Sequence, residues 1–133
     1  KVTLAAARIK SGLQKSLTLG DLDAERDWGY AADFVAGMWQ ILQHREPDDY
    51  VLATGTSHSI RDLLRIAFQH LGLDWQQHVS VDQRFLRPAD PQALLGNPSK
   101  ARQVLGWCPS VSFEQMVRMM VDSDLLAVQQ NRN

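Results

Sequence analysis

The sequence predicts a mixed α/β unit in which amphipathic helices are joined to a few short strands, and three observations support this fold class. Apolar residues recur at spacings of three and four in several stretches, which is the period of a half-buried helix. Shorter stretches either alternate apolar and polar residues or are apolar throughout, as strands are. Glycine, proline and charged turn residues separate these stretches, so each expected element has a defined end.

The composition is that of a soluble globular domain with one core. The chain has 133 residues, of which 44% are hydrophobic and 22% charged. Its 14 basic and 15 acidic residues leave a net charge of -1 and form no blocks, so we expect neither a nucleic-acid partner nor a membrane partner. Cys108 is the only cysteine, which excludes an internal disulfide and fits a reducing compartment.

No part of the sequence directs the chain to a membrane or to export. No apolar run approaches the roughly 18 residues of a spanning helix, and the N-terminus lacks the pattern of a signal peptide. We therefore expect a cytoplasmic protein. The chain begins with Lys1 rather than Met, and helical spacing starts already at Val2, which suggests a fragment of a longer protein.

The first half of the chain predicts two helices and two strands. A helix over residues 2–12 ends at a glycine suited to a left-handed cap. A short strand follows over residues 17–19. Residues 30–43 form the second helix, and its wide apolar stripe is interpreted from the pattern as core. A buried strand is expected over residues 50–54.

The second half begins with the best-formed helix of the chain. Ser59 and Asp62 are spaced as a capping box at its start, and Gly72 supplies its end. A strand is expected over residues 78–82, where apolar and polar residues alternate.

Two further helices complete the chain. A short helix starts at Asn97, which is followed by proline at the first helical position, and it ends at Gly106. Ser112 and Gln115 are spaced as a second capping box, before an amphipathic helix that continues to Val128. The methionines of this helix are interpreted as core.

Two charged loops each hold an arginine. The first, residues 20–30, carries Arg26 where the loop meets a helix, and the second, residues 84–91, carries Arg87 between residues stiffened by two prolines. A fixed guanidinium is suited to an anionic oxygen such as that of a phosphate. From the residues alone, a local salt bridge of Arg26 is the more frequent outcome, with Asp23 and Asp27 as its candidate partners.

The sequence shows no recognisable catalytic or metal motif. The four histidines and the single cysteine are not at metal-ligand spacing, so no metal site is expected. There is no glycine-rich phosphate loop and no serine flanked by glycines. The residues by themselves therefore predict a mixed helix-strand unit with two stiff, charged loops.

Four stretches resemble one family over essentially all 133 residues. They are LGDLDAERDWGYAADFVAGMW, DDYVLATGTSHSIRDLL, FLRPADPQALLGNPSKARQVLGW and MMVDSDL. Together they are similar to the C-terminal part of GDP-mannose 4,6-dehydratases, which are extended short-chain dehydrogenases/reductases. The resemblance implies an α/β fold of helices with a few short strands, without most of the N-terminal Rossmann sheet. Residues 1–133 would be the sugar-nucleotide-binding portion, with residues 30–55 packed on the missing NADP-binding domain.

The family likeness also implies an activity for the full-length protein. Such enzymes are NADP-dependent lyases that convert GDP-mannose to GDP-4-keto-6-deoxymannose. Their catalytic Thr or Ser, Glu and Tyr-x-x-x-Lys pair, with the glycine-rich NADP loop, belong to the N-terminal half. Tyr30 and Tyr50 are followed four positions on by Phe34 and Thr54, so neither supplies that pair. We expect no catalytic or NADP-binding residue here, and an inactive fragment.

The resemblance assigns a role to the two loop arginines. Arg26 and Arg87 match the guanidinium groups that clamp the diphosphate of the sugar nucleotide, which would turn binding energy into positioning of the sugar. Asp90 matches a position that is usually Glu and that would accept hydrogen bonds from the ribose hydroxyls.

The remaining expected contacts lie earlier in the chain. Leu19, Gly20 and Asp21 match the strand end that lies along the nucleotide base, and Asp21 stands where the family usually has Asn. A carboxylate there would accept hydrogen bonds from guanine N–H groups. Lys1 matches a basic residue near the phosphates.

Packing on a missing domain has a consequence for this chain. The helix over residues 30–43 would expose the apolar face of residues 34–42, and Val51 would lie on an exposed strand edge. We therefore expect self-association or an N-terminal partner; the family forms dimers and tetramers. Two alternatives stay open: another GDP-sugar epimerase or reductase of the same superfamily, and a non-catalytic interaction module.

Overall fold

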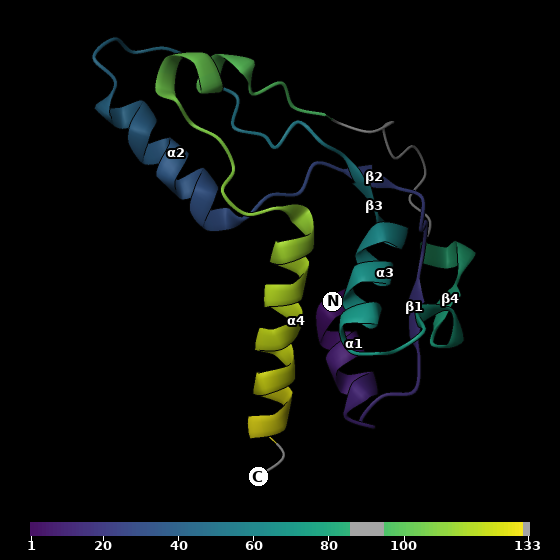
Figure 1. Cartoon of the computed structure of the whole chain (residues 1–133). Helices are drawn as coiled ribbons and strands as arrows, with labels where there is room; N and C mark the ends of the chain where they lie inside the picture. Colours follow the sequence, from purple (N-terminus) through teal and green to yellow (C-terminus); the bar gives the residue numbers. More distant parts are fainter. Residues whose placement is uncertain (86–94, 132–133) are drawn as a thin grey trace. The chain divides into compact units, whose positions relative to one another are not determined.

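The computed structural model describes residues 1–85 and 95–131 (Figure 1). The chain divides into two compact units. The first unit consists of Lys1–Ala24, Ser59–Pro91 and Val117–Asn133, and the second consists of Glu25–His58 and Gln92–Met116. Helix α4 begins in the second unit and continues into the first.

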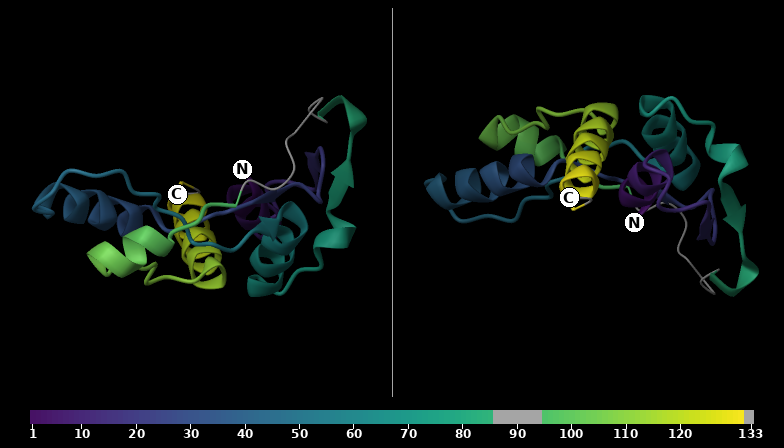
Figure 2. Two further views of the ribbon diagram at one scale, coloured as in Figure 1. Left: turned by 90° about the horizontal axis from the view of Figure 1, so that it is seen from above. Right: turned by 90° about the horizontal axis from the view of Figure 1, so that it is seen from below.

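The first unit combines helices with one pair of parallel strands. Its described elements are α1 (Val2–Lys10), β1 (Leu17–Leu19), α3 (Ile60–His70), η1 (Trp75–Gln77), β4 (Val79–Val81), η2 (Gln83–Phe85) and most of α4 (Phe113–Gln130). Strand β1 pairs with β4 in parallel, with Leu17 opposite Val79 and Leu19 opposite Val81. The two strands lie beside α1 and α3 (Figures 1 and 2). Parallel strands need a long connection, and here that connection includes α3.

The core of the first unit is built from its three helices. Leu64 and Phe68 of α3 and Val117 and Val121 of α4 are fully buried. Helix α1 contacts α3 and presents a row of buried alanines, which let two helix backbones approach closely. The amphipathic spacing of α1 and α3 therefore predicts their buried faces correctly.

The expected helix ends and caps of the first unit are confirmed. Gly12 and Gly72 follow α1 and α3 with φ angles of 72° and 67°, in the left-handed region that glycine adopts without steric cost. Ser59 and Asp62 form the capping box at the start of α3. The strands predicted over residues 17–19 and 78–82 correspond to β1 and β4.

The second unit is built around α2. Its described elements are β2 (Glu25–Arg26), α2 (Ala31–Gln43), the π-helical segment η3 (Ala101–Leu105) and the first residues of α4, and β2 pairs with the short strand β3 (His58–Ser59). Trp107 is only 3% exposed and packs on α2, with its ring 5.7 Å from that of Phe34. A Cβ added to Gly37 would lie 2.7 Å from Trp107 Nε1 and 2.9 Å from Leu52. The indole therefore requires glycine at that position of α2.

Asp33 fastens the start of α2 to the turn after Trp107. Its carboxylate accepts hydrogen bonds from the Ser110 hydroxyl at 2.6 Å and from the backbone N–H groups of Ser110 and Val111 at 3.0 and 3.2 Å. These bonds, that of the Ser110 hydroxyl first, hold the pKa of Asp33 below its usual value, against a smaller opposing effect of desolvation. The Trp107 indole N–H donates to the Asp33 carbonyl at 2.8 Å.

The cap predictions for the C-terminal helices are also confirmed. The short helix after Asn97 ends at Gly106, whose φ is 66°. Ser112 and Gln115 exchange hydrogen bonds of 2.9 and 3.2 Å as a capping box. The buried face of α4 is Val117, Val121 and Val128, whereas Met120 is 47% exposed, so its interpretation as core is wrong.

The strand expected over residues 50–54 is absent from the described structure. These residues have no strand assignment, and Val51 is 53% exposed, so the run is not fully buried either. A strand is defined by ladder hydrogen bonds to a neighbour, and no described strand pairs with this run. The apolar run therefore predicts a local preference for a strand, but no described strand pairs with it.

The apolar stripe of α2 is exposed rather than buried, so its interpretation as core is wrong. Val35, Met38, Trp39 and Leu42 are 57% to 80% exposed, and Gly37 is the one buried residue of the helix. The exposure that the family resemblance implies is thereby confirmed. Packing of this face on an NADP-binding domain stays a prediction. No helix in the described part of the chain is long and apolar enough to cross a bilayer.

Candidate functional site

The strand end expected along the nucleotide base lies in the first unit. Leu19 is the last residue of β1, and its carbonyl accepts a hydrogen bond from the Asp82 N–H at 2.9 Å, which extends the ladder with β4 by one step. Asp82 also binds the side chain of Arg84, which is the main reason that the pKa of Asp82 lies below its usual value. Gly20 and Asp21 therefore leave a strand whose end is well defined.

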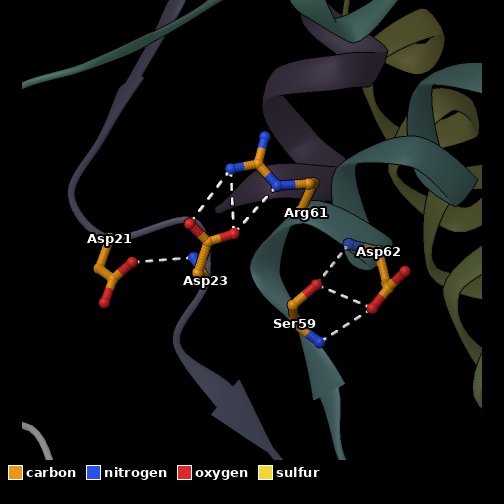
Figure 3. Close-up of polar contacts among 5 residues, drawn as sticks. All are labelled: Asp21, Asp23, Ser59, Arg61 and Asp62. Atoms are coloured by element: carbon orange, nitrogen blue, oxygen red, sulfur yellow. Dashed lines mark hydrogen bonds and ion pairs between the residues drawn. The ribbon is translucent and has the colours of Figure 1, made fainter.

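Asp21 begins a turn that its own side chain closes. Its Oδ1 accepts a hydrogen bond from the Asp23 N–H at 2.8 Å, which is an Asx turn. Asp21 itself is exposed. Figure 3 shows its second carboxylate oxygen pointing away from Asp23 and Arg61. This oxygen accepts no hydrogen bond from a described residue.

The turn after Asp21 is pinned to the first residues of α3 at four points. The Leu22 carbonyl accepts from the Arg61 N–H at 2.9 Å, and the Ala24 carbonyl accepts from the Ile60 N–H at 3.2 Å. Arg61 donates from Nε and Nη2 to the two carboxylate oxygens of Asp23 at 3.0 and 3.3 Å (Figure 3). Two backbone bonds and a bidentate ion pair thus hold one short loop.

The capping box fixes the position of Arg61. The Ser59 Oγ accepts from the Asp62 N–H at 3.0 Å, and Asp62 Oδ2 accepts from the Ser59 N–H at 3.1 Å (Figure 3). Arg61 therefore leaves a helix whose first turn is locked. Its guanidinium also lies 5.7 Å from the ring centroid of Trp75, in cation–π geometry.

Lys1 lies against the same strand. Its Nζ is 3.5 Å from the Thr18 carbonyl and 5.6 Å from the ring centroid of Phe85. Lys1, which is expected to supply positive charge near the phosphates, is therefore held close to β1. Its contact there is Thr18, the residue before Leu19.

Arg26 belongs to β2 in the second unit. It is half-buried, and its Nη1 donates to the Glu25 carbonyl at 2.6 Å. Glu25 in turn accepts a hydrogen bond from the Ser57 hydroxyl at 2.7 Å. The two carboxylates considered from the sequence as salt-bridge partners of Arg26 both bind other groups.

Asp27 ties the segment after Arg26 to the turn at residues 54–55. Its Oδ1 accepts from the Thr54 N–H at 3.0 Å and from the Thr54 hydroxyl, and its Oδ2 accepts from the Gly55 N–H at 3.0 Å. Arg102 adds a bond of 2.9 Å to the Thr54 carbonyl. The residue next to Arg26 is thus the centre of a hydrogen-bond network within the second unit.

Aromatic packing also holds this segment. Trp28 stacks on Phe113 with ring centroids 5.5 Å apart, and Phe113 stacks on His58 at 4.0 Å. A Cβ on Gly29 would lie 2.4 Å from the Phe34 ring, so only glycine fits between Trp28 and α2. Asp27, Trp28 and Gly29 follow Arg26 in the RDWG stretch, and each of them therefore makes a contact that holds this segment in place.

Two of the predicted site residues, Arg87 and Asp90, lie outside the described residues. Convergence of Arg26 and Arg87 on one diphosphate stays a prediction. Among the described residues, no group of three or more His, Cys, Asp or Glu side chains could hold a metal ion.

Sequence reasoning missed Asp23, Asp27 and Arg61 as organisers of these loops. Asp23 and Arg61 are 38 positions apart, and Asp27 and Thr54 are 27 apart, so local spacing carries no sign of either contact. The capping box was the one available signal, since it places Arg61 on the first turn of a helix.

Known structures define the class of this fold. The RMD protein of Pseudomonas aeruginosa, solved with NADPH, matches with a TM-score of 0.84 over 95% of this chain and 41% of that one, at 23% identity. The dTDP-glucose 4,6-dehydratase of Bacillus anthracis, solved with NAD, matches with a TM-score of 0.75 over 92% and 38%, at 19% identity. The fold is that of the C-terminal part of an extended short-chain dehydrogenase/reductase, as the resemblance implies.

Sequence comparisons identify the family within this class. The family model described as GDP-mannose 4,6 dehydratase matches residues 1–120. GDP-mannose 4,6 dehydratase 2 of Arabidopsis thaliana is 53% identical over 125 residues, which are 94% of this chain and 34% of that protein. The human GDP-mannose 4,6 dehydratase is 38% identical over 150 residues, with 100% and 40% covered. The chain belongs to the GDP-mannose 4,6-dehydratase family, and it spans between a third and two fifths of these two relatives.

Proposed function

We propose that this chain is the substrate-binding portion of a GDP-mannose 4,6-dehydratase, an NADP-dependent lyase that converts GDP-mannose to GDP-4-keto-6-deoxymannose. Family membership over residues 1–120 supports the proposal. The observation that carries it is the setting of Arg26, which stands beside Asp27 and its network to Thr54 and Gly55. A guanidinium on such a braced segment is suited to a diphosphate, because an anchored fork loses less entropy on binding.

The roles of the other residues follow from the same proposal. Arg87 would complete the clamp on the diphosphate with Arg26, and Asp90 would accept from the ribose hydroxyls. Leu19, Gly20 and Asp21 would lie along the guanine, and Lys1 would add positive charge near the phosphates. None of these residues reacts; each binds or orients the substrate, so that its sugar is presented to groups outside this chain.

The nicotinamide cofactor is proposed to bind to the part of the enzyme that this chain does not span. NADP accepts and returns a hydride in such a reaction. The chain's residues do not fit a site for it, since the sequence has neither a glycine-rich loop nor a Tyr-x-x-x-Lys pair. We therefore expect this chain alone to be inactive.

The exposed face of α2 is proposed to pack on that cofactor-binding part. Val35, Met38, Trp39 and Leu42 form a large apolar surface on one short helix, and Val51 is also exposed. Alone, the chain would self-associate through these side chains. Size measurement by sedimentation tests this expectation, because a compact monomer at high concentration contradicts it. The whole enzyme is proposed to be a cytoplasmic dimer or tetramer.

Calorimetry with GDP-mannose tests the binding role. We expect Arg26→Ala and Arg87→Ala each to weaken binding by roughly tenfold to a hundredfold, the value of one charge-assisted hydrogen bond. Arg65→Ala is the matched control, since Arg65 is exposed and pairs only loosely with Asp62, at 3.7 Å. Equal affinities in all four proteins, or no binding by the unmodified chain, contradict the proposal.

A chimaera tests the reaction itself. This chain would replace the corresponding part of the Arabidopsis relative, which is 53% identical to it. The expected product from GDP-mannose and NADP is the 4-keto-6-deoxy sugar nucleotide, identified by mass and by carbonyl absorbance.

Another reaction on the same scaffold is the alternative within the enzyme class. A putative epimerase of Burkholderia cenocepacia matches this chain with a TM-score of 0.80 at 21% identity, so the fold alone also accommodates epimerases. An epimerised or reduced sugar nucleotide from the chimaera supports this alternative. A chimaera that binds GDP-mannose and forms no product supports the non-catalytic module.

A further inference from the structure

We draw no further inference here: the strongest candidate, the exposed apolar patch that Val35, Met38, Trp39 and Leu42 form on α2, belongs to the contact with the cofactor-binding part that is already proposed, and nothing among the described residues shows a second partner for it.

Discussion

Helices α2 and α3 have similar lengths and comparable apolar stripes, but only α3 buries its stripe. In α3, Leu64, Ile66, Ala67 and Phe68 are all less than 9% exposed. In α2, four large apolar side chains lie on the surface, namely Val35, Met38, Trp39 and Leu42. Trp107 is contacted by the other side of the helix, at Asp33, Phe34 and Gly37. Periodicity thus identifies which face of a helix is apolar, whereas a second element must be present to cover it.

The two helices should differ most in the unfolding free energy that is lost when a large apolar side chain is replaced by alanine. Phe68→Ala should cost about 3 to 5 kcal/mol of unfolding free energy, because the ring is fully buried and leaves a cavity. Trp39→Ala in α2, where the indole is 63% exposed, should change it by less than about 0.5 kcal/mol. Urea unfolding followed by far-ultraviolet circular dichroism measures both. Comparable losses would show that α2 is covered in solution, for instance by a second copy of the chain.

A smaller effect is expected at the one position where α2 is closely packed. Gly37→Ala should cost about 1 to 3 kcal/mol, since the new Cβ would lie 2.7 Å from Trp107 Nε1 and force the indole to move. Ala36→Ser on the exposed side of the same helix is the control. Tryptophan fluorescence should change in the Gly37 variant and stay constant in the control. A neutral Gly37→Ala would mean that Trp107 is not held against α2.

The helix caps provide a third comparison. Ser59→Ala should destabilise the chain by about 1 kcal/mol, because it leaves the Asp62 N–H without its acceptor. The N-cap of α2 is Tyr30, which makes no side-chain cap hydrogen bond, so Tyr30→Phe should have almost no effect on the start of that helix. Hydrogen exchange of the first-turn amides resolves the two helices separately. Equal protection in Ser59→Ala and the unmodified chain would contradict the role of the box.

The smallest expected effect is a dependence of stability on pH. The pKa of Asp33 is lowered in the folded chain, chiefly by the Ser110 hydroxyl, so the folded state binds this proton less readily than the unfolded state. The contribution of Asp33 is complete above its unfolded pKa of about 4 and is lost as the pH falls through the lower folded value. Asp33→Asn should remove this loss of stability at low pH. The measurement is the midpoint of urea unfolding between pH 6 and pH 3. An unchanged pH profile in the variant would contradict the assignment.

Local signals in the sequence predicted most of the fold. Gly12, Gly72 and Gly106 marked helix ends, and the Ser59 and Ser112 boxes marked helix starts, because caps and left-handed turns depend on a few neighbouring residues. The run at 50–54 predicted a strand that the described structure lacks, since strand pairing depends on a distant partner. The resemblance, rather than the apolar pattern, predicted that this face of α2 is exposed.

The candidate site could be predicted only in part, because the contacts that hold it join residues far apart in the sequence. The resemblance supplied Arg26, Asp21 and the strand end, and the structure places each on a well-held segment. It did not supply the side chains that hold those segments. Asp23 and Asp27 look like ordinary acidic loop residues in the sequence, and only the folded chain shows that one binds Arg61 and the other the Thr54–Gly55 turn.

The parallel pairing of β1 with β4 also has a consequence for synthesis. Thr18 and Ser80, which face each other across the two strands, are separated by 62 positions. A ribosome that adds about 5 to 20 residues per second therefore exposes β1 for roughly 3 to 12 seconds before its partner has been translated. During that interval β1 has no partner strand, so Leu17, which is buried in the folded chain, stays accessible until residues 79–81 have been made.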